Sequence, residues 1–350
     1  MNFSDAERAA MEQALQLARR GVRGANPLVG AVILDPSGEV LASGFHRGAG
    51  TAHAEADALA AASAAGIDVR GATMVVTLEP CNHTGRTGPC SQAILRSGIA
   101  RVVYAAADTN EDAAGGAAAL TAGGVEAGGG LLADESRELN SRWAAAMAGR
   151  RPFVTVKTAQ TLDGRTAAAD GTSQWITSPE ARADAQDLRR RVDAVLAGRG
   201  TIQADNPRLT ARDPDGSTAE KQPLRVVMGR TPVPAEAAVR GTDGRFVQIP
   251  THDPAVVLAE LYARGVRHVM VEGGGTVAGA FLRAGLADEL VAYTAPALLG
   301  AGTAAFAGLG IASMARIQRW RWDPAGGGAA VPVGPDLRLH LEPIPFDEPQ

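Results

Sequence analysis

The sequence predicts two domains of the α/β class. The chain has 350 residues, and at roughly 100–200 residues per domain this length corresponds to about two domains. In both halves, apolar segments of strand length alternate with segments of helical periodicity, which is typical of α/β layers. The motif Gly149-Arg150-Arg151-Pro152 interrupts this alternation. We therefore place the domain boundary near residue 149, with domains at 1–149 and 150–350.

The composition narrows the class of protein. Hydrophobic residues make up 45% of the chain and charged residues 21%, which is ordinary for a globular protein. The net charge of −4 shows no excess of the basic residues that bind nucleic acids, so we expect no nucleic-acid partner. No apolar run approaches the ~20 residues of a membrane span, and the N-terminus lacks the apolar core of a signal peptide. Two closely spaced cysteines form no disulfide framework, so we expect a cytoplasmic location.

The N-terminal half begins with a helix and continues with alternating strands and helices. Ser4 and Glu7 have the spacing of a capping box before apolar residues at helical spacing. The turn Asp35-Pro36-Ser37-Gly38 predicts a hairpin. The other expected elements are strands at 29–34, 39–45, 73–78 and 101–106, helices at 54–65, 91–97 and 135–147, and a weak helix within 113–130.

The C-terminal half repeats the alternation without sharing a motif with the first. Its first expected strand, 153–160, ends before an Asp163-Gly164 turn. Segments 213–222 and 230–245 are rich in turn residues and predict loops. The other expected elements are helices at 179–191, 254–264 and 276–284, strands at 192–197, 224–228, 266–271 and 289–293, and an edge or antiparallel strand at 336–341.

The clearest chemical signal is His53-Ala54-Glu55 followed by the only two cysteines, Cys81 and Cys90. One imidazole and two thiolates suit Zn²⁺, and three protein ligands leave a position open, as in catalytic sites. Glu55 would then be the unligated carboxylate that moves protons. Zinc nucleobase deaminases carry H-x-E followed by P-C-x-x-C. Here the second part is stretched, with eight residues between the cysteines.

The expected helices fit such a site. Residues i and i+2 do not share a helix face, so His53 and Glu55 can converge on one metal only in a helix's first turn. Cys90 precedes another expected helix, and a helix N-terminus lowers the pKa of a thiol. Three alternatives remain: two buried cysteines, a disulfide, or a structural zinc site with His83 as the fourth ligand.

Together with Cys81-x-His83-x-Gly85-Arg86-Thr87-x-Pro89-Cys90, the motif resembles the family of bifunctional riboflavin-biosynthesis deaminase–reductases. The resemblance implies a cytidine-deaminase-like α/β/α domain followed by a dihydrofolate-reductase-like α/β domain. The implied reactions are hydrolytic deamination of 2,5-diamino-6-(5-phosphoribosylamino)pyrimidin-4(3H)-one and NADPH-dependent reduction of the product's ribosyl group to ribityl. The implied deaminase substrate contacts are Asn26, His46, His83, Arg86, Asp108 and Asn110.

A second chemical signal is the glycine-rich turn after the expected strand 266–271. Residues 273–278 match G-x-G-x-x-A, and a strand, a glycine loop and a helix N-terminus together can cradle a phosphate. A plain tight turn explains so short a match equally well. The acid that a dinucleotide fingerprint places about 20 residues later is not evident.

Four segments, at 157–165, 173–177, 200–210 and 272–274, resemble the family's reductase domain. The implied NADPH contacts are Ala159, Trp175, Thr201, Asp205, Gly274, Gly275, Thr276, Val277, Ala278, Gly279 and Ala280. The implied substrate contacts are Ser173, Arg189, Leu209, Arg212 and Glu272, with the arginines facing a phosphate whose oxygens suit guanidinium groups. The sequence departs from the family at Met228-Gly229-Arg230, where most members carry Asp-Ser.

Lys157 and Asp163 are further candidates for the reductase site. Only two of the 34 lysines and arginines are lysines, Lys157 and Lys221, and guanidinium does not replace an ammonium group whose pKa can be adjusted. A snorkelling strand lysine is an equally good explanation of Lys157. Arg189 could instead lie on a solvated helix face within its three-arginine run, and Asp163 could be only a turn residue.

The expected partners are small phosphorylated pyrimidines and further copies of the chain in a homo-oligomer. Three other functions remain: a nucleoside or tRNA deaminase with an unrelated second domain, a monofunctional enzyme with one decayed half, and a non-enzymatic zinc-binding module. The long cysteine spacing and the lack of a basic patch disfavour the first. The departure at Met228 permits the second. Glu55 and the open coordination disfavour the third.

Overall fold

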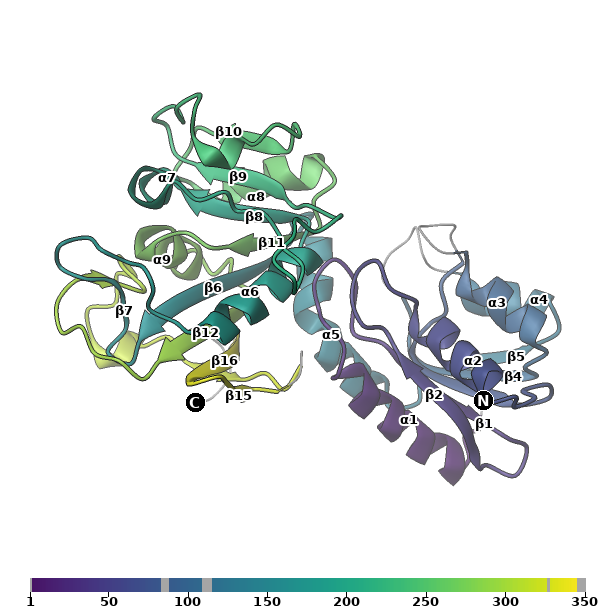
Figure 1. Cartoon of the computed structure of the whole chain (residues 1–350). Helices are drawn as coiled ribbons and strands as arrows, with labels where there is room; N and C mark the ends of the chain where they lie inside the picture. The colour runs from purple at the N-terminus through teal and green to yellow at the C-terminus, as the bar shows by residue number, and fades with distance from the viewer. Residues whose placement is uncertain (1, 83–87, 109–114, 326–327, 345–350) are drawn as a thin grey trace. The chain divides into compact units, whose positions relative to one another are not determined.

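The structure is a computed structural model that describes residues 2–82, 88–108, 115–325 and 328–344. The chain divides into two compact units (Figure 1), one made of Met1–Ala145 with Ala325–Gly327 and the other of Ala146–Pro324 with Gly328–Gln350. Both units are of the predicted α/β class. In the part of the chain that the structure describes, no helix has the length and apolar character needed to span a bilayer.

The first unit is built on a five-stranded sheet with the order β2-β1-β3-β4-β5. Strand β1 pairs antiparallel with β2 and β3, whereas β3, β4 and β5 are parallel. The strands are β1 (Gly30–Leu34), β2 (Val40–Phe45), β3 (Thr73–Leu78), β4 (Arg101–Ala106) and β5 (Glu126–Gly129). The helices are α1 (Asp5–Ala18), α2 (Ala54–Ala64), α3 (Cys90–Ser97), α4 (Gly116–Ala122) and α5 (Ala133–Ala148).

Helices cover both faces of this sheet. Val32 and Leu34 of β1 pack in a core with Met11 of α1, while Ala31 and Ile33 point to the other face and pack with residues of α2, α3 and α4. The strands are therefore buried on both sides, as in other α/β/α layers. The expected capping box is present, because Ser4 Oγ accepts from the Glu7 amide at 3.1 Å and Glu7 Oε2 accepts from the Ser4 amide at 2.7 Å.

The second unit contains a nine-stranded sheet with the order β10-β9-β8-β11-β6-β12-β16-β14, and β15 also pairs with β16. In this order, the neighbouring strands β10, β9, β8, β11, β6 and β12 are parallel to one another. Strand β16 pairs antiparallel with β12, and β14 and β15 pair antiparallel with β16. The strands are β6 (Phe153–Thr161), β8 (Ala194–Gly198), β9 (Leu224–Met228), β10 (Phe246–Ile249), β11 (His268–Val271), β12 (Glu289–Ala295), β14 (Trp320–Trp322), β15 (Ala330–Val333) and β16 (Asp336–Pro343).

Short elements and α-helices complete the described part of this unit. A separate two-stranded ribbon is formed by β7 (Arg165–Ala167) and β13 (Thr303–Ala304). The helices are α6 (Pro179–Arg191), α7 (Arg199–Asp205), α8 (Pro254–Ala263) and α9 (Gly275–Arg283), with 3₁₀ turns at Ala238–Arg240 and Met314–Arg316.

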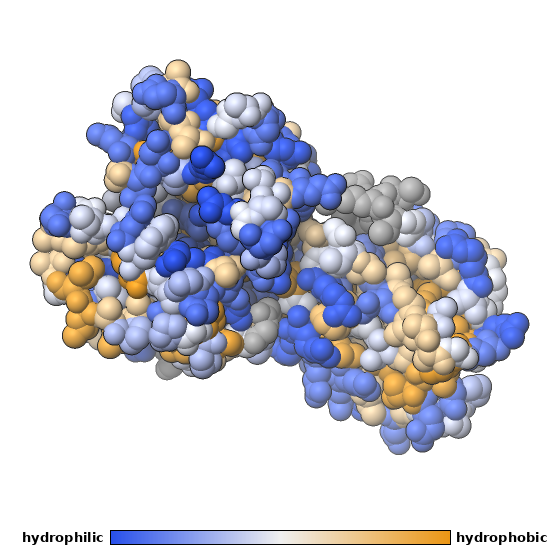
Figure 2. All heavy atoms as spheres, viewed as in Figure 1, coloured by the Kyte–Doolittle hydropathy of each residue, from blue (hydrophilic) through white to orange (hydrophobic). Residues whose placement is uncertain are grey.

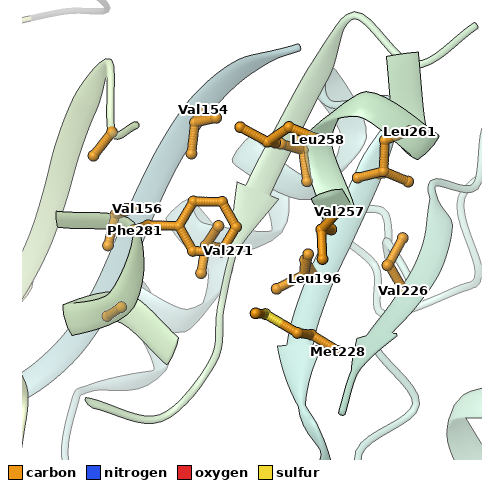
Figure 3. Close-up of a cluster of buried hydrophobic side chains, with 14 of the residues drawn as sticks. Val154, Val156, Leu196, Val226, Met228, Val257, Leu258, Leu261, Val271 and Phe281 are labelled. Carbon is orange, nitrogen blue, oxygen red and sulfur yellow. The ribbon is translucent and has the colours of Figure 1, made fainter. Parts of the chain in front are cut away.

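The parallel strands of the second unit are buried on both faces. Figure 3 shows a hydrophobic core on one face of the sheet, in which Leu196, Val226 and Val271 meet Leu258 of α8 and Phe281 of α9. The alternate strand residues pack in a second core on the opposite face. Because these strands are parallel, their carboxyl ends lie along one edge of the sheet, where α/β proteins bind ligands.

Candidate active sites

His53, Cys81 and Cys90 lie together at the carboxyl end of β3 and the first residues of two helices. His53 is the N-cap of α2, and Cys90 is the first residue of α3. The Nδ1 atom of His53 lies 3.6 Å from Cys81 Sγ and 3.4 Å from Cys90 Sγ. Zinc bond lengths of about 2.0 Å to nitrogen and 2.3 Å to sulfur place tetrahedral N and S ligands about 3.6 Å apart. The three side chains therefore have the spacing of a zinc site.

The two thiols are free and form no disulfide. The pKa of Cys81 is lowered to about 4, first by the hydrogen bond from the Cys90 thiol and also by His53. The same contact with Cys81 raises the pKa of the Cys90 thiol. Zinc binds thiolates, and the lowered pKa of Cys81 favours its thiolate form. His83, the alternative fourth ligand, lies outside the described residues.

Glu55 lies in the first turn of α2, beside the three side chains. It is 4% exposed, and burial raises the pKa of its carboxyl group to about 7. A carboxyl group with a pKa near neutrality can both accept and release a proton during a reaction. Its place in the first helical turn agrees with the i, i+2 argument from the sequence.

Two predicted substrate contacts form a hydrogen-bonded pair next to this cluster. Asn26 Nδ2 donates to His46 Nε2 at 3.0 Å, and His46 Nδ1 donates to the Ala52 carbonyl at 2.9 Å. The His46 ring lies 5.5 Å from the His53 ring, and burial lowers the pKa of His46, which favours the neutral imidazole. These contacts fix both the tautomer and the orientation of the ring.

Asp108, a third predicted contact, follows β4. The pKa of His53 is raised first by its hydrogen bond with Cys81, and Asp108 contributes to the rise, so its carboxylate is near enough to act on the cluster. The predicted contacts His83, Arg86 and Asn110 lie outside the described residues.

The second unit contains a cleft of about 1860 Å³ at the carboxyl edge of its parallel strands. In Figure 2 the surface of this unit is hollowed, and hydrophilic residues surround the hollow. The cleft is lined by fifteen of the eighteen residues predicted for the reductase site. They are Lys157, Ala159, Ser173, Trp175, Arg189, Thr201, Asp205, Leu209, Arg212, Glu272, Gly274, Gly275, Thr276, Val277 and Ala280.

The charged centre of the cleft is Glu272, which follows β11. Its side chain is 6% exposed and lies 3.2 Å from Lys157 Nζ and 2.6 Å from Arg189 Nη2. Burial acts to raise the pKa of Glu272, but the charges of Arg189 and Lys157 hold that pKa below its ordinary value. Arg189 is therefore not on a solvated helix face, and Lys157 has a buried partner instead of reaching toward solvent.

Two further contacts connect the loops of the cleft. Ser173 Oγ donates to Asp205 Oδ1 at 2.9 Å, and the Gly274 amide donates to Thr201 Oγ1 at 3.1 Å. Gly274 is the N-cap of α9 and has no side chain. No side-chain cap therefore competes with an anion for the first N–H groups of that helix.

Three predicted reductase residues lie away from the cleft lining. The Asp163 carboxylate accepts hydrogen bonds from Thr161 Oγ1 at 2.6 Å and from the Gly300 amide at 2.7 Å, and the bond from Thr161 lowers its pKa to about 2. Ala278 belongs to the hydrophobic core. A Cβ atom on Gly279 would lie 1.8 Å from the Ala307 carbonyl oxygen. All three positions have a structural explanation.

The sequence analysis missed a polar pair that also lines the cleft. The Tyr293 hydroxyl donates to Asp184 Oδ2 at 2.5 Å, and Lys157 Nζ lies 5.6 Å from the centre of the Tyr293 ring. Tyr293 of β12 is paired with Ala159 of β6. To predict the position of Tyr293 from the sequence, one would have to know that strands 153–160 and 289–293 pair with each other.

Two family models match the chain. Residues 4–106 match the cytidine and deoxycytidylate deaminase zinc-binding region, and residues 152–330 match the RibD C-terminal domain. The riboflavin biosynthesis protein RibD of Mycobacterium tuberculosis is 43% identical over 341 residues, covering 97% of both chains. RibD of Escherichia coli is 38% identical over 367 residues, covering 95% of this chain and 98% of the other.

Two solved structures are similar over nearly the whole length. Acinetobacter baumannii RibD superposes with a TM-score of 0.75 at 34% identity, covering 97% of this chain and 99% of the other. The Thermotoga maritima diaminohydroxyphosphoribosylaminopyrimidine deaminase/5-amino-6-(5-phosphoribosylamino)uracil reductase has a TM-score of 0.73 at 31% identity, with the same coverage. The cluster of His53, Cys81 and Cys90 is thus the zinc site of a deaminase domain, and a dihydrofolate-reductase-like domain follows it. The chain belongs to the RibD family of bifunctional deaminase–reductases of riboflavin biosynthesis.

Proposed function

We propose that the first unit deaminates 2,5-diamino-6-(5-phosphoribosylamino)pyrimidin-4(3H)-one and that the second unit reduces the ribosyl group of the product with NADPH. The observation that carries the proposal is that each unit holds its own cluster of groups suited to one of the two reactions. One set is the zinc cluster with buried Glu55, and the other is the cleft containing Lys157, Glu272 and Arg189. The name of the Thermotoga maritima relative states the same pair of activities for that protein.

In the deaminase site, His53, Cys81 and Cys90 would hold zinc. When bound, zinc supplies a Lewis acid that lowers the pKa of water from 15.7 toward about 7. Glu55 would accept a proton from the attacking water and then donate protons to the ring nitrogen and to the departing ammonia. Its pKa of about 7 supports such a two-way role.

Substrate orientation in this site would depend on the neighbouring polar groups. Asn26 and His46, which hold each other by a hydrogen bond, would contact the pyrimidine together with Asp108. We also propose His83, Arg86 and Asn110 as substrate contacts, because the resemblance to the family implies this role for them.

In the reductase site, NADPH when bound supplies a hydride, and the proposed acceptor is ribose C1′. The C1′–O4′ bond breaks, and O4′ must gain a proton. We assign Lys157 to the O4′ side of the ribose as the proton donor, because Glu272 holds its ammonium group inside the cleft. Arg189 and Arg212 would bind the ribose phosphate, since guanidinium groups form strong paired hydrogen bonds with phosphate oxygens.

The pyridine nucleotide would lie along the same edge of the sheet. Its pyrophosphate would face the N-terminus of α9 at Gly274 and Gly275, where N–H groups and the helix dipole favour an anion. The remaining proposed contacts within the cleft lining are Ala159, Trp175, Thr201, Asp205, Thr276, Val277 and Ala280. For Ala278 and Gly279, which lie behind this surface, a cofactor role would be indirect.

We also propose a homo-oligomer in a reducing, cytoplasmic environment. Leu162 and Leu298 are 67% and 72% exposed, on segments joined by the hydrogen bond from the Leu162 amide to the Ala297 carbonyl. Such apolar exposure supports a protein contact. Light scattering coupled to size-exclusion chromatography measures the number of chains directly.

The proposed reducing environment follows from the zinc ligands. The two thiols at the zinc site must stay reduced to act as ligands.

The proposed activities can be tested by feeding the purified protein the diaminopyrimidine phosphate with and without NADPH. Ammonia should be released in both cases, and NADPH should be oxidised only when the substrate is present. Ammonia release without NADPH oxidation would indicate a monofunctional deaminase. Absence of both reactions with zinc bound would contradict the proposal.

A further inference from the structure

The turns after three neighbouring strands form one wall of the cleft. Strands β9, β8 and β11 are adjacent and parallel, so their carboxyl ends lie side by side at intervals of about 4.8 Å. Arg199 follows β8, Met228 ends β9, and Gly274 follows β11 by three residues, and all three line the cleft. The hydrogen bond from the Gly274 amide to Thr201 Oγ1 connects the turns after β11 and β8.

The guanidinium group of Arg199 is only partly satisfied in this wall. Its Nε donates to the Pro232 carbonyl at 3.2 Å. Its Nη1 is buried and has no hydrogen-bond partner among the described residues, and no carboxylate of the described chain forms an ion pair with it. Buried polar groups are nearly always hydrogen-bonded, so the Arg199 guanidinium keeps hydrogen-bonding capacity that the described residues do not use, on a partly exposed side chain that lines the cleft. A phosphate group suits the planar fork of a guanidinium.

The turn after β9 is shaped to admit this arginine. Gly229 has a φ of +141°, and a Cβ atom there would lie 2.9 Å from the Arg199 Cβ. A residue other than glycine would therefore displace the stem of Arg199. The preceding residue, Met228, is 4% exposed and apolar (Figure 3). The end of β9 thus offers no carboxylate that would repel a phosphate beside Arg199.

We propose that Arg199 binds the 2′-phosphate of NADPH and is the principal residue that discriminates NADPH from NADH. This inference rests on the proposed reductase function. When a dinucleotide binds across the carboxyl ends of parallel strands, its pyrophosphate lies at a glycine turn before a helix. An acid at a nearby strand end reads the ribose 2′-hydroxyl of NAD, whereas an arginine there accommodates the 2′-phosphate of NADP. Here the glycine turn precedes α9, and Arg199 lies at the end of the adjacent strand.

The test compares the dissociation constants of NADPH and NADH, measured by nicotinamide fluorescence, for the wild-type chain and for Arg199→Ala. Removing a hydrogen-bonded charge pair should weaken NADPH binding about 10- to 100-fold. NADH, which lacks the 2′-phosphate, should change less than about twofold. The KM for NADPH should rise in parallel while kcat is largely retained. Arg199→Met, which keeps the apolar stem, should give the same selectivity if loss of packing disturbs Arg199→Ala.

Arg208→Ala is the matched control, because Arg208 is an exposed arginine that lines the same cleft. It removes the same charge and should leave the NADPH-to-NADH ratio unchanged. An equal shift in this control would make the effect one of general charge and overturn the assignment. If Arg199→Ala weakened the binding of both nucleotides equally, Arg199 would contact a group that they share, such as the pyrophosphate, and the proposed role in selectivity would be wrong. If the variant weakened the binding of neither nucleotide, Arg199 would not contact the cofactor.

The outcomes also separate this inference from the function on which it rests. A wild-type chain that binds and oxidises neither nucleotide in the presence of the uracil substrate would overturn the reductase proposal itself. A variant that still turns over with unchanged NADPH preference would overturn only the role of Arg199.

Discussion

Lys157 and Glu272 form an ion pair inside the reductase cleft, with Nζ 3.2 Å from Oε1 and both side chains largely buried. Arg189 occupies the other oxygen of the same carboxylate. The ammonium group is thus held in one place by a partner that is itself fixed. This arrangement gives a physical reason why lysine stands here in a chain that otherwise uses arginine almost throughout.

Lys157→Arg should impair reduction more than stability. The charge and the pairing with Glu272 are kept, but the guanidinium is wider and does not release a proton. We expect the reductase kcat to fall at least about tenfold, as for loss of a positioned proton-transfer group, with little change in Tm. Lys221→Arg is the control, because Lys221 is the only other lysine and is exposed. Normal NADPH-dependent turnover by Lys157→Arg would reduce Lys157 to a structural residue.

The zinc content should be about one ion per chain and should be lost in both Cys81→Ser and Cys90→Ser. Serine is a poor ligand for zinc, and the chain has no third cysteine to replace the missing thiolate. Elemental analysis of purified variants measures this directly, with circular dichroism to verify folding. Unchanged zinc in the two folded variants would show that the metal is held elsewhere.

Two glycines of the α9 segment should respond differently to alanine. A Cβ on Gly279 would lie 1.8 Å from the Ala307 carbonyl oxygen, whereas a Cβ on Gly274 would lie 3.5 Å from Thr201 Oγ1. Gly279→Ala should therefore lower the free energy of unfolding by about 1–3 kcal/mol or more. Gly274→Ala should keep the stability and weaken NADPH binding. Urea unfolding and nucleotide titration distinguish the two, and equal loss of stability would contradict the account.

Glu289 should make the second unit sensitive to acid. Its Oε2 lies 2.8 Å from His340 Nε2, and Thr155 Oγ1 donates to its Oε1 at 2.5 Å. Burial acts to raise the pKa of Glu289, but His340 and the other polar partners lower it to about 2. The folded pKa is below the unfolded value of about 4.3. The stabilisation is therefore fully present above about pH 4.3 and is lost as the pH falls toward 2.

The corresponding experiment compares urea unfolding of the wild-type chain and Glu289→Gln from pH 7 to pH 3. Glu289→Gln should be less stable at pH 7, and the difference should shrink toward pH 3, because only the wild type has the carboxylate to protonate. Both proteins carry the same zinc ligands, so acid release of zinc affects them equally. A difference that does not depend on pH would contradict the assignment.

Local signals in the sequence predicted most of the fold. Strands β3, β4 and β9 agree with the predicted ranges because each is an apolar run bounded by turn residues. Strand β5 was missed within a segment that we expected to be weakly helical, and only α4 is helical there. Its sequence, Glu126–Gly129, has little β propensity, and its pairing with β4 defines it as a strand.

The same distinction applies to the sites. His53, Glu55, Cys81 and Cys90 were found because the motif places them close in sequence or at helix starts. Tyr293 and Asp184 meet only through strand register and a helix packed on the sheet. The unsatisfied donor on Arg199 likewise depends on the turns after two adjacent strands.

The most direct test of the central claim, that the chain has two independent active sites, is the pair of activities of Glu55→Gln. Glutamine has nearly the same shape but cannot accept the proton, so zinc and folding should be retained. Deamination should fall by at least about 10²–10⁴-fold, the usual contribution of general acid–base catalysis. NADPH oxidation with the deaminated uracil intermediate should equal that of the wild type. Loss of both activities in a folded, zinc-loaded variant would contradict the two-site account, and loss of neither would make Glu55 a structural carboxylate.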